Sequence, residues 1–237
     1  MKFSYLYTAL IIAELFAIVF NLHTAEYFTK PALVISLLVY FLNSSKTPAN
    51  NKILVALPKR YDQPTNRPAD QPTNMLIALL FCLAGDIILL FDSGFVFGLA
   101  AFLIGHIFYI LTFRKDNDGF NFTKNRLGLF ILGSVLFGII FLSVLIPRVD
   151  TALKIPIFIY ACTILTMLVT VFNRFKKTIS KISYNSVLIG ALFFVISDTV
   201  LAINQFVQPF AYAHFIVMLT YGLAQYFIVE GFLKKEM

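Results

Sequence analysis

The chain of 237 residues is rich in apolar residues and poor in charge. Hydrophobic residues make up 59% of it and charged residues only 13%, and its mean hydropathy is +0.83. A soluble domain is closer to half apolar and a quarter charged. This composition leaves no room for a soluble domain of ordinary size and favours one membrane-embedded domain over residues 1–237. The net charge of +7 is not a signal for nucleic acid, because the basic residues lie between apolar runs.

Apolar stretches along the whole chain predict about eight transmembrane helices, because stretches of this length can cross a bilayer. The expected spans are Phe3–Leu22, Ala25–Leu42, Met75–Phe91, Phe95–Phe113, Leu127–Ile146, Ala152–Phe172, Tyr184–Val207 and Phe210–Leu233. Pro31 lies in the second stretch, and we expect that helix to begin before it and to tolerate proline in its first turns. The predicted fold class is therefore an all-α polytopic membrane helix bundle.

The positions of Lys and Arg predict the orientation of the bundle. Of the 19 such residues, all but Lys30, Arg148 and Lys154 fall on one side of the predicted spans. Cytoplasmic loops carry this excess of positive charge, so both termini are expected in the cytoplasm. The expected location is the inner (cytoplasmic) membrane of a bacterium, in which the protein is multi-pass.

Between the second and third spans, residues 43–74 form a long connection. The connection contains the sequence DQPTN twice, at Asp62–Asn66 and Asp70–Asn74. A segment rich in Pro, Asn and Thr cannot bury a core, so a mobile cytoplasmic loop is expected.

An internal repeat is a further hypothesis. Asp86 is followed by a leucine three residues later and a tyrosine 23 residues later, and Asp198 is followed by the same residue types at the same offsets. This pattern is typical of two parallel copies of four helices, although apolar segments also mimic one another by chance.

Four ionisable residues are expected deep in the membrane. Counted from the span ends at about 1.5 Å per residue, Glu14, Asp86 and His106 lie roughly 16 Å deep and Asp198 about 21 Å deep. Such groups are costly in lipid and usually face a cavity or a partner. Interhelical hydrogen bonds are one explanation, but the matched depth favours a shared functional cavity. Asp86, His106 and Asp198 could also bind a cation, but ligand spacing is lacking, so no metal and no cofactor are expected.

Several motifs together resemble one known family. They are Thr-Lys-Pro at Thr29–Pro31, Gly-Asp-x-x-Leu at Gly85–Leu89, Phe-x-x-x-His-x-x-Tyr at Phe102–Tyr109, the block from Gly190 to Ala202 containing Ser197-Asp198, and Tyr-x-x-Ala-Gln-x-x-Ile-x-x-Gly at Tyr221–Gly231. In this order they resemble the YhhN-like membrane proteins, the family that contains the animal lysoplasmalogenases. The resemblance implies an eight-helix fold and hydrolysis of the vinyl ether bond of lysoplasmalogens. The 43–74 loop is longer than is usual for that family.

This chemistry suggests roles for the buried residues. A vinyl ether is hydrolysed through protonation of its β-carbon, so it needs a proton donor, a negative group near the resulting cation and a base for water. Asp86 and Asp198 are the expected catalytic pair, His106 would orient water or relay a proton, and Lys30 would meet the phosphate of a lysophospholipid. The other expected substrate-binding residues are Glu14, Tyr109, Ser197, Asn204, Tyr221 and Gln225, of which Tyr109, Tyr221 and Gln225 would hold the glycerol and ether oxygens.

Two other functions fit part of the pattern. A transporter for a small or lipidic solute would also use carboxylates at mid-membrane depth. An intramembrane aspartyl protease would use Gly85-Asp86, but its partner Tyr-Asp motif is missing from the apolar segments. The expected partners are a lysophospholipid substrate and membrane lipids, and the sequence does not indicate an oligomeric state.

Overall fold

The computed structural model describes residues 3–44, 70–116, 125–174 and 179–234, and their regular structure is entirely helical. The α-helices in these ranges are α1 (Phe3–Val19), α2 (His23–Ser44), α3 (Gln71–Ile88), α4 (Phe95–Arg114), α5 (Asn125–Leu145), α6 (Thr151–Phe172), α7 (Lys181–Ala202) and α8 (Ala213–Leu233). Within the described residues, α2 to α8 are long and apolar enough to cross a membrane, and α1 is apolar but shorter, with 17 residues. The predicted all-helical membrane bundle is thus confirmed.

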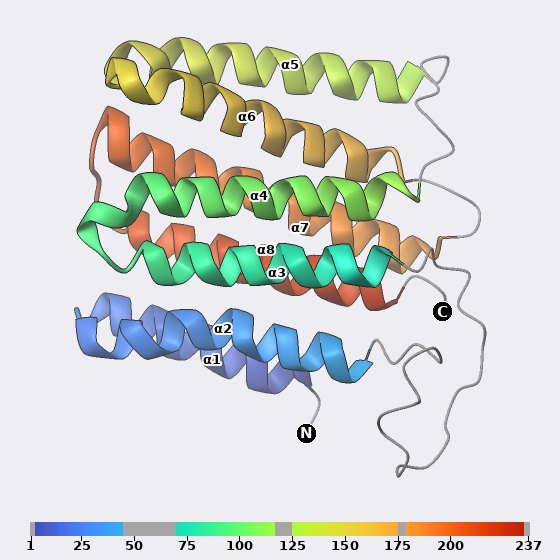
Figure 1. Ribbon diagram of the computed structural model, residues 1–237, viewed down its shortest axis with the longest axis horizontal. Helices are drawn as coiled ribbons and strands as arrows, with labels where there is room; N and C mark the ends of the chain where they lie inside the picture. The colour runs from blue at the N-terminus through green and yellow to red at the C-terminus, as the bar shows by residue number, and fades with distance from the viewer. Residues whose placement is uncertain (1–2, 45–69, 117–124, 175–178, 235–237) are drawn as a thin grey trace.

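The helices lie side by side along one common direction, with α1 and α2 at one edge of the bundle and α5 at the other (Figure 1). The first turn of α1 and the last turn of α8 lie at the same end of the bundle, at the right of Figure 1. An even number of crossings requires this arrangement. Which end faces the cytoplasm stays a prediction from the charge distribution, and so does the four-plus-four repeat.

Helix boundaries differ from the predicted ones mainly at special residues. Helix α2 begins at His23 and continues through Pro31, as expected. Helix α3 begins at Gln71 rather than Met75, because proline is well tolerated in a first helical turn. The second DQPTN copy is therefore the start of a helix, whereas the first copy and the rest of the 43–74 loop, residues 45–69, lie outside the described residues. Helix α7 ends at Ala202 and is followed by a π-helical turn, Ile203–Val207.

Glycines allow two helix pairs to pack closely. A Cβ atom on Gly85 of α3 would lie 2.7 Å from the Phe102 ring of α4. A Cβ atom on Gly190 of α7 would lie 2.8 Å from the backbone oxygen of Ala224 in α8. Small residues at such positions are typical of membrane helix interfaces, and they hold α3 against α4 and α7 against α8.

Helix α8 is the most buried of the described spanning helices, and α5 is the least buried. Helix α8 packs on α7, α1 and α2. Polar contacts reinforce two of these interfaces: Tyr7 of α1 donates to the backbone oxygen of Gly222 at 2.9 Å, and Tyr40 of α2 donates to Glu230 at 2.8 Å. Helix α5 packs mainly on α6, and this leaves one side of the bundle loosely covered.

A buried ion pair, not anticipated from the sequence, joins the helix ends next to the C-terminal end of α8. Arg174, just after α6, donates from Nε to Asp116, just after α4, at 2.8 Å, and both side chains are fully buried. Gln71, at the start of α3, donates to Asp116 at 2.7 Å and to the backbone oxygen of Thr112 at 2.8 Å. Burial lowers the pKa of the Arg174 guanidinium, and the Asp116 carboxylate acts in the opposite direction. Arg174, Asp116 and Gln71 thus link the ends of α6, α4 and α3 at one point.

Candidate functional site

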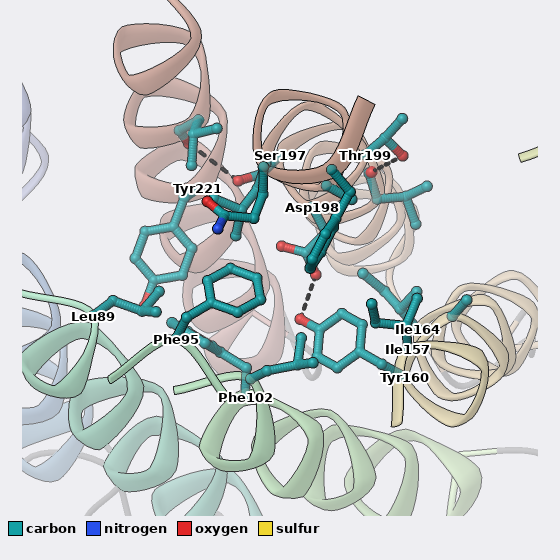
Figure 2. A pocket seen from close by; sticks show the side chains of 18 of the residues that line it. Leu89, Phe95, Phe102, Ile157, Tyr160, Ile164, Ser197, Asp198, Thr199 and Tyr221 are labelled. Carbon is teal, nitrogen blue, oxygen red and sulfur yellow. Dashed lines mark hydrogen bonds between the residues drawn. The ribbon is translucent and has the colours of Figure 1, made fainter. Parts of the chain in front are cut away.

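A cavity of about 320 Å³ opens inside the bundle and is lined by residues of every helix from α2 to α8. Most of its walls are apolar and aromatic, including Phe95, Phe102 and Ile164 (Figure 2). Its polar and charged lining residues are Lys30, Asp86, Tyr160, Ser197, Asp198, Thr199, Gln205, His214 and Tyr221. A mostly apolar pocket with a few converging polar groups is the usual form of a small-molecule site.

The two aspartates line this one cavity, and each accepts a hydrogen bond from a tyrosine. Tyr221 of α8 donates to Asp86 Oδ2 at 2.7 Å, and Tyr160 of α6 donates to Asp198 Oδ2 at 2.5 Å. Figure 2 shows Asp198 reaching from α7 toward Tyr160 across the cavity. Asp86 is 1% exposed, so the protein shields it from bulk water, whereas Asp198 is half-buried. Two carboxyls fixed by phenols can exchange protons with a bound molecule.

Tyr109 and Gln225 were expected to contact the substrate, but they do not line the cavity. Tyr109 donates to Gln225 Oε1 at 2.6 Å, and Gln225 donates from Nε2 to the Tyr221 oxygen at 3.2 Å. The chain of hydrogen bonds therefore ends on Asp86. Both residues are fully buried and are absent from the cavity lining, so they orient Tyr221.

His106 is also buried behind the cavity lining. Its Nδ1 lies 2.7 Å from the backbone oxygen of Phe102, which makes Nδ1 the protonated nitrogen. Its Nε2 has no hydrogen-bond partner among the residues that the structure describes. The ring packs edge-on against Phe194 and Tyr160, at 4.8 and 5.5 Å between centroids. His106 thus touches the tyrosine that holds Asp198 but does not itself reach the cavity.

Charged side chains gather at one mouth of the cavity. Lys30 and His214 are in the lining, and His214 Nδ1 lies 3.8 Å from Glu26. Glu14 lies outside the lining and accepts a hydrogen bond from Thr29. Ligand atoms of Glu14, Glu26 and His214 are within 4.8 Å of one another, a spacing that could hold a cation, although the positive charge of Lys30 nearby opposes one. Two of the four deep ionisable residues, Asp86 and Asp198, therefore share the cavity, whereas Glu14 and His106 flank it.

The remaining predicted residues have local roles in the structure. Ser197 lines the cavity and donates to the backbone oxygen of Val217 at 3.1 Å. Asn204 lies in the π-helical turn and accepts from the backbone nitrogen of Phe210 at 3.2 Å, so it holds the α7–α8 connection. Its neighbour Gln205 is the residue that lines the cavity. π-Helical turns are frequent at functional sites.

Tyr160 and His214 line the cavity but were not predicted as site residues. The span that contains Tyr160 carries no motif of the resembling family, and a tyrosine in an apolar segment gives no signal by itself. His214 lies in the first turn of α8, outside the motifs that resemble the family. Its position opposite Glu26 depends on how α8 packs against α2, which the sequence does not reveal.

The chain matches the model of the YhhN family over residues 25–232. It is 30% identical to human lysoplasmalogenase TMEM86B over 169 residues, which cover 71% of this chain and 67% of that protein. It is also 30% identical over 157 residues to human lysoplasmalogenase TMEM86A, covering 65% of this chain and 62% of that protein. A lysoplasmalogenase homologue of Dictyostelium discoideum is 26% identical over 60% of this chain and 54% of its own length. No solved structure matches the chain. The chain belongs to the YhhN family.

Proposed function

We propose that this protein is a membrane-embedded hydrolase that cleaves the vinyl ether bond of lysoplasmalogen-like lysolipids, in the inner membrane of a bacterium. The observation that carries the proposal is a pair of carboxyls, the buried Asp86 and the half-buried Asp198, in one mostly apolar cavity. The relatives named lysoplasmalogenase support the same class of substrate. The products are a fatty aldehyde and a glycerophospho head group.

The reaction divides into two proton transfers. A protonated carboxyl gives its proton to the β-carbon of the vinyl ether, and an oxocarbenium ion forms at the α-carbon. The second, ionised carboxyl stabilises that cation and takes a proton from the water that attacks it. The hemiacetal then breaks its carbon–oxygen bond, which releases the aldehyde and restores the glycerol hydroxyl.

The surroundings of the two aspartates suit this division of work. Two carboxyls in different surroundings can divide the roles of proton donor and base between them. Tyr221 and Tyr160 each donate to one carboxyl oxygen and leave the other oxygen for substrate or water. We assign Asp86 and Asp198 jointly as the acid and base, with Tyr221 and Tyr160 as positioning residues.

The mouth of the cavity suits the polar head of a lysolipid. Lys30 supplies a positive charge for the phosphate, and His214 adds a second hydrogen-bonding group beside it. The aromatic and aliphatic walls suit an alkenyl chain. The substrate would thus lie with its head at the mouth and its vinyl ether between the aspartates.

Turnover by the purified protein tests the proposed function. In detergent, the protein should release fatty aldehyde from a vinyl-ether lysolipid but not from the saturated alkyl-ether analogue with the same head group. The saturated ether cannot be protonated at carbon, so it controls for other ether-cleaving activities. Uptake of lysolipid into liposomes without aldehyde formation would overturn the proposal and favour a transporter.

A further inference from the structure

A second apolar groove adjoins the cavity on the lipid-facing side of α5, α6 and α7. Its lining residues are Arg126, Leu129, Phe130, Gly133, Ser134, Phe137, Leu165, Leu168, Phe172, Leu192, Val195 and Ile196. Phe137, Leu165 and Val195 line both the cavity and this groove. We call this groove, which follows α5 from Phe137 to Arg126, the chain groove.

The chain groove begins beside Asp198 and leads away from the charged mouth. Val195 lies one turn before Asp198 on α7, and Leu165 lies five residues after Tyr160 on α6. From Phe137 to Arg126 the groove follows eleven residue steps of α5, roughly 16 Å at the rise of an α-helix. This length suits the distal part of a long alkyl chain.

The groove has the chemistry of an alkyl-chain site. The hydroxyl of Ser134 donates to the backbone oxygen of Phe130 in its own helix at 2.9 Å, so this side chain offers no free donor. The other lining residues except Arg126, at the far end, are apolar. Gly133 has no atom within 4 Å of the position that a Cβ would take, so the middle of the groove is open.

We propose that the chain groove holds the distal part of the substrate's alkenyl chain and thereby sets the position of the vinyl ether between Asp86 and Asp198. This inference rests on the proposed function. A chain whose head group occupies the mouth and whose vinyl ether passes the carboxyls would enter the groove beside Phe137, Leu165 and Val195. Lipid tails are as apolar as these side chains, so the groove contributes alignment of the reacting bond rather than hydrophobic affinity.

Filling the groove at Gly133 tests the proposal. Purified Gly133→Phe is compared with the wild-type protein on octenyl and octadecenyl vinyl-ether lysolipids that share one head group. For the octadecenyl substrate, kcat/KM should fall on the order of tenfold, the effect of forcing extra carbons into an occupied apolar space. For the octenyl substrate it should stay unchanged, because the short chain ends before Gly133.

Gly128→Phe is the matched control. Gly128 lies on the same helix, also has no atom within 4 Å of a Cβ position, and is outside the groove lining, so neither substrate should be affected. Gly133→Ala, a smaller filling, guards against misfolding of the phenylalanine variant and should lower only the octadecenyl rate, by less than Gly133→Phe.

Equal loss on both substrates, or no loss on either, would overturn the chain-groove proposal while wild-type turnover leaves the proposed function standing. A change from dimer to monomer in Gly133→Phe alone, measured by light scattering in detergent, would also overturn it, because the groove would then be an interface between copies. If the wild-type protein releases no aldehyde from either substrate, the proposed function itself fails.

Discussion

Each aspartate in the cavity is paired with a phenol from a different helix. Tyr221 comes from α8 and is itself held by Gln225 and Tyr109, whereas Tyr160 comes from α6 and contacts the ring of His106. A carboxyl that is fixed in this way keeps one orientation toward a bound substrate. The tyrosines should therefore matter for the rate of the reaction more than for binding.

Tyr221→Phe and Tyr160→Phe should each lower kcat roughly tenfold, because a hydrogen bond to a carboxyl that is charged, or becomes charged as it gives up its proton, contributes about 1.5 kcal/mol. KM should change little. The matched control is Tyr40→Phe, which also removes a tyrosine–carboxylate bond, to Glu230, outside the cavity. Steady-state kinetics in detergent checks the prediction. Equal loss in all three variants would mean that the tyrosines act only through stability.

Lys30→Gln should raise KM for a lysolipid substrate several-fold and leave kcat nearly unchanged, because a lysine at the mouth binds the phosphate away from the reacting bond. The effect should vanish on an alkenylglycerol that lacks the phosphate. Lys154→Gln, which changes a lysine outside the cavity lining, is the control. A loss of the same size on both substrates would rule out a phosphate role for Lys30.

The sequence predicted which residues belong to the site better than it predicted the directions in which their side chains point. Depth in the membrane and motif membership indicated Asp86, Asp198 and Tyr221, all of which line the cavity. Depth does not define the rotation of a helix, so His106, at a similar depth, was expected in the cavity but lies behind it. Tyr160 was missed because its partner, Asp198, is 38 residues away in sequence.

Close packing of α7 on α8 positions Asp198 and Tyr221 on adjacent helices. Gly190 is essential to this approach, since a Cβ there would meet the backbone of Ala224, which cannot move aside as a side chain can. The two helices would have to separate to accept a larger residue.

Gly190→Ala should destabilise the protein by about 1–3 kcal/mol, the usual cost of overpacking a tight interface, and should reduce activity. Gly128→Ala, in a position with open space around it, should have no such effect. The apparent melting temperature of each purified variant in detergent checks this. If Gly190→Ala has the same melting temperature as the wild-type protein, α7 and α8 are not tightly packed at this position.

The presence of each helix was predictable, because a long apolar stretch is a strong signal for a membrane-spanning helix. The eight helices of the described ranges all correspond to predicted spans. Their ends were less predictable. Helix α3 starts early because Pro72 is favoured in a first turn, and the π-helical turn after Ala202 has no pattern that distinguishes it from continued helix.

The molecule as a whole is tightly packed around α8 and loosely packed at α5. The buried pair of Arg174 and Asp116 fastens the opposite end of the bundle from the charged mouth of the cavity. Sequence reasoning counted Arg174 only as a topology signal. A charge in a connecting segment is usually solvated, and only the folded bundle buries it.

Arg174→Gln should destabilise the bundle by about 3–5 kcal/mol, because it removes the buried guanidinium that donates to the Asp116 carboxylate. The control is Asp70→Asn, which breaks a largely exposed pair with Lys115 at the same end of the bundle and should cost at most about 1 kcal/mol. Unfolding in detergent measures both. Equal stability of the two variants would contradict a stabilising role for the buried pair.

The most direct measurement is the turnover of a vinyl-ether lysolipid by purified Asp86→Asn and Asp198→Asn, with folding verified by melting temperature. An asparagine fits the site but cannot donate or accept the proton, so each variant should lose at least about a hundredfold in kcat. If both variants fold and release aldehyde at the wild-type rate, the two carboxyls are not the acid and base of this reaction.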